Sequence, residues 1–201
     1  NKDESDTTTL NTNAIRSIAE DGQGNLWVST GWGISRYNRD FDNFIRYYHN
    51  PDDTNSLGGN KIGDMYCDSQ KRFWILGRKA SLYDPVQDRF KNFNIPYSAK
   101  LGNWKITRSN IFEDNKGRVW FICYREIFYF SRKKQKIVQF FEGNNRAWGD
   151  GKDWYFRNMV QIDSNTFWIS TRNAGVIVAQ PYKSNKLEPF DGFKGIDNKI
   201  L

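Results

Sequence analysis

Two acidic pairs and a single histidine are the side chains in this sequence that could carry chemistry. Glu20–Asp21 and Glu113–Asp114 each place two carboxylates side by side, and paired carboxylates can act as general acid and base. His49 is the only histidine, so a Ser-His-Asp or Cys-His site would have to be built from it. It lies in a loop rich in Pro and Asp, away from any strand end that would orient it. We therefore expect no catalytic role for His49.

The acids belong to a repeat, which changes how they are interpreted. Trp27, Trp74, Trp120 and Trp168 are spaced by 47, 46 and 48 residues, and each follows an Asp at short distance. A period of about 40–50 residues is typical of propeller blades. Because the acids recur at one turn of the repeat, we interpret them as hairpin-turn residues. The four tryptophans are likewise interpreted as packing residues and not as a sugar-stacking ladder.

Each repeat reads as four short strands joined by tight turns. In the first copy these strands are expected at 15–20, 26–30, 34–37 and 44–47. Four such strands repeated around an axis make an all-β fold, a β-propeller with four-stranded antiparallel blades. Because a further strand begins at the end of the chain, we expect an arc of a larger ring; alternatively, that strand closes a ring by completing the first blade. The expected blades of this 1–201 propeller fragment cover 13–48, 60–94, 106–141 and 154–191, with a further strand at 196–201.

Composition supports a strand-rich domain. Aromatic residues make up 16% of the chain, with 15 Phe, 10 Tyr and 8 Trp, and such side chains favour strands. The longest apolar run, Val119 to Tyr124, covers about six residues, whereas a membrane-spanning helix needs about 20. We therefore expect membrane contact only through a helix outside this segment. Cys67 and Cys123 have no zinc or disulfide-scaffold spacing, and we predict neither a metal nor a cofactor.

Particular segments resemble the two-component regulator propellers. Residues 47–62 read Tyr-Tyr-His-Asn-Pro-Asp-Asp-Thr-Asn-Ser-Leu-Gly-Gly-Asn-Lys-Ile, similar to the linker between blades in that family. Residues 18–30, 111–123 and 33–37 (Gly-Ile-Ser-Arg-Tyr) look like the same repeat. The resemblance covers roughly residues 10–201 and is weakest in the fourth repeat. It implies a seven-bladed ring in the periplasmic sensor of a hybrid two-component system of Bacteroides type, which binds an oligosaccharide or related nutrient and regulates a histidine kinase.

Ligand contacts are expected where loops interrupt the repeat, because binding residues concentrate on loops held by a rigid scaffold. Turns after the tryptophan strands and the connectors between blades should meet on one rim of the ring. Aromatic rings there could contact sugar C–H groups and arginines could bind carboxylate or sulfate; the alternative is that these side chains pack between blades or domains. The candidates are Trp32, Arg78, Lys79, Trp104, Tyr124, Arg125, Trp148, Trp154, Arg172 and Asn173.

Charge narrows the expected partners. The net charge is +7, which favours acidic partners at modest salt. The basic run 132–136 joins two expected strands, and we interpret it as a solvated hairpin tip. An oligosaccharide with acidic groups fits the resemblance better than nucleic acid, for which we expect no direct role. Further partners would be the remaining blades and domains of a longer protein, or a second copy in a homodimer.

Three classes of function remain open from the sequence. The first is the extracytoplasmic, non-enzymatic sensor that the resemblance implies. The second is a carbohydrate-active propeller enzyme, a glycosidase or lyase, since propellers host such sites; no carboxylate pair outside the repeat turns supports it. The third is a structural arc that serves interaction or oligomerisation.

Overall fold

The computed structural model describes residues 6–97, 109–142, 155–172, 175–183 and 187–189, and all regular structure in these ranges is strand. Sixteen strands form four antiparallel four-stranded sheets, here called blades 1–4. Blade 1 contains β1 (Ile15–Glu20), β2 (Leu26–Thr30), β3 (Ile34–Asn38) and β4 (Asn43–Tyr47). Blade 2 contains β5 (Asp64–Cys67), β6 (Phe73–Leu76), β7 (Lys79–Asp84) and β8 (Arg89–Asn94). Blade 3 contains β9 (Ser109–Glu113), β10 (Val119–Cys123), β11 (Glu126–Ser131) and β12 (Lys136–Glu142). Blade 4 contains β13 (Phe156–Gln161), β14 (Phe167–Thr171), β15 (Val176–Ala179) and β16 (Leu187–Pro189).

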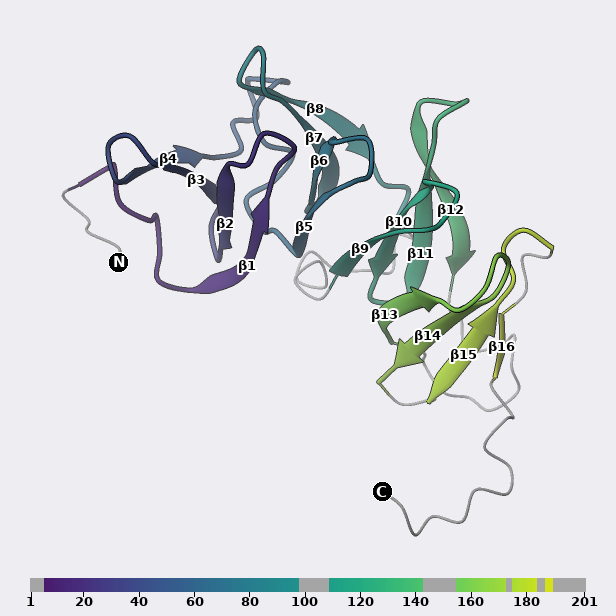
Figure 1. Cartoon of the computed structure of the whole chain (residues 1–201). Coiled ribbons are helices and arrows are strands. Elements are labelled where there is room, and N and C mark those ends of the chain that lie inside the picture. The colour runs from purple at the N-terminus through teal and green to yellow at the C-terminus, as the bar shows by residue number, and fades with distance from the viewer. Residues whose placement is uncertain (1–5, 98–108, 143–154, 173–174, 184–186, 190–201) are drawn as a thin grey trace, which may run out of the picture.

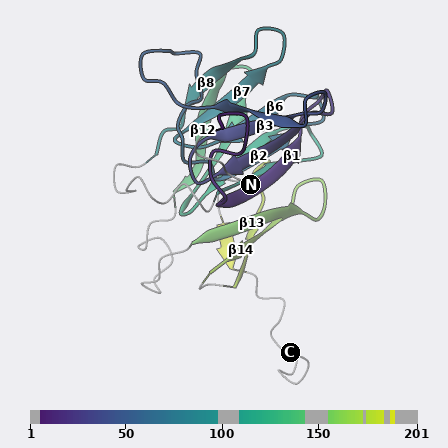
Figure 2. The same cartoon turned by 90° about the vertical axis from the view of Figure 1, so that its left-hand side faces the viewer.

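The blades follow one another along an arc, from blade 1 in purple to blade 4 in yellow-green (Figure 1). Their first strands, β1, β5, β9 and β13, contact one another in sequence along the inner side of the arc. Figure 2 views the arc from the side of blade 1 and shows β13 and β14 set below the other sheets. The all-β propeller arc predicted from the 47-residue period is therefore confirmed. In the part of the chain that the structure describes, no helix has the length and hydropathy needed to cross a membrane.

The recurring Asp shapes the hairpin between the first two strands of a blade. In blade 1, Asp21 Oδ1 accepts hydrogen bonds from the backbone N–H groups of Gln23 and Asn25. Gly24 completes the turn with a φ of 85°, a conformation that favours glycine. Lys71 stands in the corresponding turn of blade 2 and still adopts a φ of 63°. The turn geometry thus persists where the glycine is replaced.

The same carboxylate also fixes the repeated tryptophan. Asp21 Oδ2 accepts a hydrogen bond from Trp27 Nε1 at 2.8 Å, and the equivalent pairs in blades 2 and 3 are separated by 2.9 and 2.7 Å. All three indole rings are fully buried, and a buried indole N–H requires an acceptor. In these three blades the Asp and the Trp six residues later therefore form one structural unit, which confirms the turn role predicted for the Asp and the packing role predicted for the Trp.

Each tryptophan packs against the next blade. Trp27 lies 5.3 Å from Phe73, and Trp74 lies 5.6 Å from Phe121, measured between ring centroids. Trp120 lies 6.0 Å from Phe167 of blade 4. Aromatic contacts at these distances add to the gain from apolar burial. The core therefore consists of three apolar layers between successive blades and not of one central mass.

Candidate functional site

One end of the arc gathers the turns after the second strand of each blade and the starts of the innermost strands. Backbone hydrogen bonds tie these segments together. Gly31 N–H donates to Ala14 O at 2.9 Å in blade 1, and Gly63 N–H donates to Leu76 O at 2.8 Å in blade 2. We call this end the rim. It is the edge on which the sequence placed the ligand-binding candidates.

A cluster of aromatic and basic side chains lies on the rim where blades 3 and 4 meet. Phe156 N–H of blade 4 donates to Tyr124 O of blade 3 at 2.6 Å, and Arg172 N–H donates to Tyr155 O at 2.9 Å. The rings of Tyr124 and Tyr155 lie 4.6 Å apart at 42°. These tyrosines line a crevice with Phe156, Arg157 and Arg172. Tyr124, Tyr155, Arg157 and Arg172 are called the rim cluster below.

The crevice has no room for a water molecule. A ligand would therefore lie across the outer surface of the rim cluster. Arg172 is exposed and Arg157 is half-buried, so both guanidinium groups belong to a site that solvent can reach. Tyr124 holds a φ of 45°, in the left-handed region that non-glycine residues seldom occupy. Such strained positions cluster at functional sites.

The structure places the other described rim candidates at the turns after β2, β6 and β10, on blades 1, 2 and 3. Trp32 is 55% exposed in the turn between β2 and β3. Arg78 is exposed before β7, and Lys79 is half-buried as the first residue of that strand. Arg125 is half-buried beside Tyr124. The remaining candidates lie outside the described residues: Trp104, Trp148, Trp154 and Asn173.

Two members of the rim cluster, Tyr155 and Arg157, were not among the sequence candidates. Arg157 sits at a β-bulge, where the pairing of β13 with β14 shifts between Phe156 and Asn158. A bulge re-aims a side chain at the end of a strand. The same shift occurs at Arg16 in β1. The sequence does contain a signal for this bulge: an Arg follows the first apolar residue of the innermost strand both at 15–17 and at 156–158.

A row of polar side chains follows the innermost strands toward the axis. Equivalent repeat positions hold Ser17, Asp64, Asn110 and Asn158. Asp64 connects three blades, because it lies 3.4 Å from Ser17 Oγ and accepts the backbone N–H of Ile111 at 2.9 Å. Burial raises the pKa of Asp64, although its hydrogen bonds act in the opposite direction. This carboxylate links blades and is the one charged member of the row.

Three of the four acids that form the pairs in the sequence, Asp21, Glu113 and Asp114, make structural hydrogen bonds. Asp21 and Asp114 are buried under the tryptophans that they bind. Glu113 accepts hydrogen bonds from the backbone N–H and the hydroxyl of Ser69 in blade 2. His49 Nδ1 lies 2.7 Å from Leu57 O. Within the described residues, no group of three or more His, Cys, Asp or Glu side chains could hold a metal ion.

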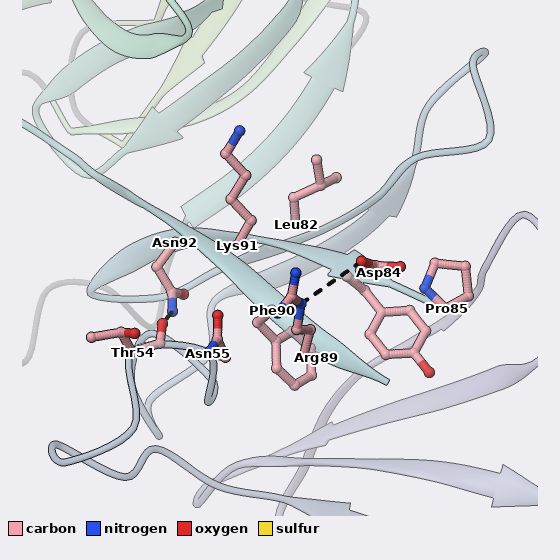
Figure 3. A pocket seen from close by; sticks show the side chains of 10 residues that line it. Thr54, Asn55, Leu82, Asp84, Pro85, Arg89, Phe90, Lys91 and Asn92 are labelled. Carbon is pink, nitrogen blue, oxygen red and sulfur yellow. Dashed lines mark hydrogen bonds and ion pairs between the residues drawn. The ribbon is translucent and has the colours of Figure 1, made fainter. Parts of the chain in front are cut away.

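A hollow of about 510 Å³ lies on the outer edge of blade 2 (Figure 3). Its walls are the last two strands of the blade and the connector from blade 1. The connector covers the edge of β8, since Phe90 N–H donates to Asn55 O and the Asn92 amide donates to Thr54 O. Arg89 lies 3.9 Å from Asp84 in this hollow. The hollow forms where the connector covers and protects the edge strand β8. It carries less positive charge than the rim cluster, because Asp84 lines it together with Arg89 and Lys91.

Comparison with known proteins agrees with this architecture. Residues 9–32 match the two component regulator propeller family. The extracellular domain of BT4673 from Bacteroides thetaiotaomicron, described as a hybrid two component system, superposes with a TM-score of 0.50 and 17% identity, over 92% of this chain and 31% of that chain. An auxiliary nutrient binding protein from Bacteroides ovatus superposes with a TM-score of 0.56 and 14% identity, over 94% of this chain and 50% of that one.

A third structure with a similar fold belongs to a secretion system. PorZ, a surface component of the type-IX secretion system of Porphyromonas gingivalis, superposes with a TM-score of 0.55 and 17% identity, over 86% of this chain and 26% of that one. No curated protein sequence matches the chain. The chain spans about a third of the length of the first structure and half or less of the other two.

These identities are low enough that the superpositions show the fold alone. The sequence match is confined to the first repeat, a shorter range than the four repeats to which the resemblance was extended. It includes the whole β1–β2 hairpin with the Asp21–Trp27 unit, and the start of the turn that follows β2. The chain is thus a β-propeller arc that carries a two-component regulator propeller repeat at residues 9–32.

Proposed function

We propose that this chain is part of the extracytoplasmic ligand-binding propeller of a hybrid two-component signalling protein, and that its rim cluster binds an oligosaccharide with acidic groups. The observation that carries the proposal is the grouping of two arginines with two tyrosines whose rings contact each other across the junction of blades 3 and 4. The propeller repeat at 9–32 supports the signalling context. A nutrient-binding protein with the same fold supports a binding role over a purely structural one.

The chemistry of the rim cluster suits an acidic sugar. A guanidinium group presents two N–H donors that match a carboxylate or a sulfate. Tyrosine offers an apolar ring and a hydroxyl at little cost in conformational entropy. Arg157 lies in the first strand of blade 4 and Arg172 directly follows the second strand, whereas Tyr124 comes from blade 3. A ligand that contacts all of them would bridge two blades.

The exposed faces at the two ends of the arc favour a larger ring. Ile18 is 65% exposed in blade 1, whereas Met65, Ile111 and Met159 occupy the same repeat position with exposures of 4%, 7% and 4%. The position is buried wherever a preceding blade covers it. We therefore propose that further blades of the same protein cover Ile18 at one end and the half-buried Trp168 at the other.

In this proposal, ligand binding regulates a histidine kinase elsewhere in the same protein. A ligand that bridges blades 3 and 4 binds most tightly to one packing of these blades and so shifts the population toward it. The described acids would take no part in catalysis, because Asp21 and Asp114 already serve the buried tryptophans. Release of shorter sugars from an acidic oligosaccharide by the purified chain would contradict this non-enzymatic assignment.

Calorimetry with defined oligosaccharides tests the proposed binding. We expect the chain to bind a tetramer of galacturonic acid in preference to the neutral tetramer of glucose. The double variant Arg157→Gln/Arg172→Gln should weaken the binding about tenfold or more, since hydrogen bonds to charged groups contribute about 1.5–3 kcal/mol each. The matched control, Arg89→Gln/Lys91→Gln on the outer edge of blade 2, removes the same charge. Equal weakening by both variants would reject the rim cluster as the site.

A further inference from the structure

A second basic site lies at the end of the arc opposite the rim. A pocket of about 340 Å³ opens between the β9–β10 and β11–β12 hairpins of blade 3 and the turn after β15 of blade 4. We call it the base pocket. Among the lining residues that the structure describes, four carry cationic side chains and none is a carboxylate. The lining consists of Lys116, Gly117, Arg118, Tyr129, Phe130, Ser131, Arg132, Lys133 and Tyr182.

Arg118 differs from the equivalent arginine of the preceding blade. Arg72 also stands four residues after the turn Asp, and its guanidinium group pairs with that residue, Asp68, at 2.6 Å. In blade 3 the corresponding carboxylate of Asp114 accepts a hydrogen bond from the hydroxyl of Tyr182. Burial raises the pKa of Tyr182, so the hydroxyl keeps the proton that it donates. Tyr182 thus takes the place that an arginine occupies in blade 2.

The displaced guanidinium group is held in place by aromatic rings. Its carbon atom lies 4.6 Å from the ring centroids of both Tyr129 and Tyr182. Arginine stacked on aromatic rings keeps its N–H edge available for an anion. Within the described part of the chain, Arg118 has no carboxylate within ion-pair distance. The pocket therefore contains a pre-oriented cation whose charge is not balanced by an ion pair.

The other cations surround the same space. Lys116 Nζ lies 3.5 Å from the centroid of the Tyr182 ring. Arg132 Nη2 donates to Gly117 O at 2.6 Å and so fixes one hairpin against the other. Lys133 is exposed at the tip of the β11–β12 hairpin. In the described ranges of the chain, neither Asp114 nor Glu113 forms an ion pair with these cations: Asp114 accepts hydrogen bonds from Trp120 and Tyr182, and Glu113 accepts them from Ser69 of blade 2.

We propose that the base pocket binds a tetrahedral oxyanion, the sulfate or phosphate group of a small sugar ester. Such a group offers three terminal oxygens that can accept hydrogen bonds from several cations at once. A carboxylate has only two oxygens, and both lie in one plane. The tyrosine faces already contact Arg118 and Lys116, so recognition rests on charge and hydrogen bonds. The volume lies at the lower end of the range for ligand pockets, about 300–1,000 Å³, and suits one sugar unit.

Binding of four related sugars tests this site without reference to the rim cluster. The probes are glucose 6-sulfate, glucose 6-phosphate, glucuronate and glucose, titrated into the chain and followed by calorimetry at low salt. We expect one or both esters to bind, glucuronate to bind more weakly and glucose not to bind. The stronger of the two esters identifies the source of the oxyanion. The double variant Lys116→Gln/Lys133→Gln should weaken ester binding about tenfold.

Two controls separate this site from general electrostatics and from the rim cluster. Arg89→Gln/Lys91→Gln removes the same charge from blade 2 and should leave ester binding unchanged, as should Arg157→Gln/Arg172→Gln on the rim. Ester affinity that falls equally in the blade 2 control overturns the proposal. Binding of glucuronate as tight as that of the esters also overturns the proposal. The absence of ester binding at about 10 mM ester overturns it as well. Because Lys116 and Lys133 are both exposed, the test variant should unfold at the wild-type temperature.

Discussion

Substitution of Asp21 by alanine should destabilise the chain strongly, although the residue sits in a surface hairpin. The carboxylate is 6% exposed and accepts hydrogen bonds from Trp27 Nε1, from the side chain of Asn25 and from two backbone N–H groups. Removing it leaves the fully buried Trp27 indole without this acceptor, which costs about 1–3 kcal/mol. With the loss of the turn bonds, we expect a total of about 3 kcal/mol.

Thermal unfolding followed by circular dichroism measures this loss. For a chain of about 200 residues, 3 kcal/mol corresponds to a fall in Tm of about 6–12 °C. The matched control is Asp163→Ala in blade 4. Asp163 is exposed and accepts hydrogen bonds from the backbone N–H groups of Asn165 and Thr166, so its loss should lower Tm by about 2 °C or less.

The pH dependence gives a second readout of the same argument. Burial acts to raise the pKa of Asp21, but its hydrogen bonds from Trp27 and from the turn outweigh burial and lower the pKa overall. A carboxyl group with a lowered folded pKa stabilises the fold above its unfolded pKa, and this contribution is lost as the pH falls through the folded pKa. The Tm difference between wild type and Asp21→Ala should therefore shrink in acid. Equal losses of Tm in Asp21→Ala and Asp163→Ala would contradict the stabilising role of the Asp21 carboxylate. So would a Tm difference between wild type and Asp21→Ala that does not change with pH.

Three further predictions concern single positions. Asp64→Asn should raise Tm at neutral pH and flatten the stability profile in acid, because burial raises the pKa of Asp64 and wild-type stability then increases as the pH falls through that value. Lys71→Gly should stabilise the chain in urea unfolding by about 0.5–1 kcal/mol, and the reverse exchange Gly24→Lys should destabilise it, because both residues hold a positive φ. A thiol reagent at pH 8 should label half-buried Cys67 before Cys123, since burial raises the pKa of Cys123 to about 12; simultaneous labelling in the folded state would contradict this.

The fold could be predicted because the repeat is encoded locally. The Asp at one end of a hairpin and the Trp six residues later must meet if the two strands pair, so their recurrence marks each blade. In the fourth repeat the turn is one residue shorter. Asp163 Oδ1 accepts hydrogen bonds from the backbone N–H groups two and three positions later, whereas Asp21 Oδ1 accepts them from the N–H groups two and four positions later. The weaker fourth repeat seen in the sequence therefore corresponds to a shorter turn in the structure. Trp168 is half-buried at the end of the described arc.

The candidate site could be predicted only in part. Tyr124 and Arg172 could be placed on the rim from the sequence. Successive turns of an antiparallel blade lie at opposite ends, so the turns after the second strands all lie at the same end. Arg157 reaches the rim through a bulge, and a bulge arises from the pairing of β13 with β14. The bond between Tyr182 and Asp114 joins residues 68 positions apart in two blades. No local pattern encodes that contact. The basic run at 132–136, interpreted from the sequence as a solvated hairpin tip, is exposed at the hairpin of β11 and β12, as predicted.

The two proposed sites lie at opposite ends of the junction between blades 3 and 4. An arginine also contacts tyrosines at the junction between blades 1 and 2, but its charge is balanced there. Between blades 1 and 2, Arg36 donates to Tyr83 at 2.7 Å and lies 3.8 Å from Asp88, so its charge is balanced within the protein. At the blade 3–4 junction, Arg118 contacts tyrosine rings without such a partner. A ligand anion in the base pocket would supply the missing charge and would favour the packing that brings Tyr182 against Arg118. Because a ligand shifts an equilibrium only through its difference in affinity between two states, we propose this junction as the place in the described arc where binding would change how blades pack.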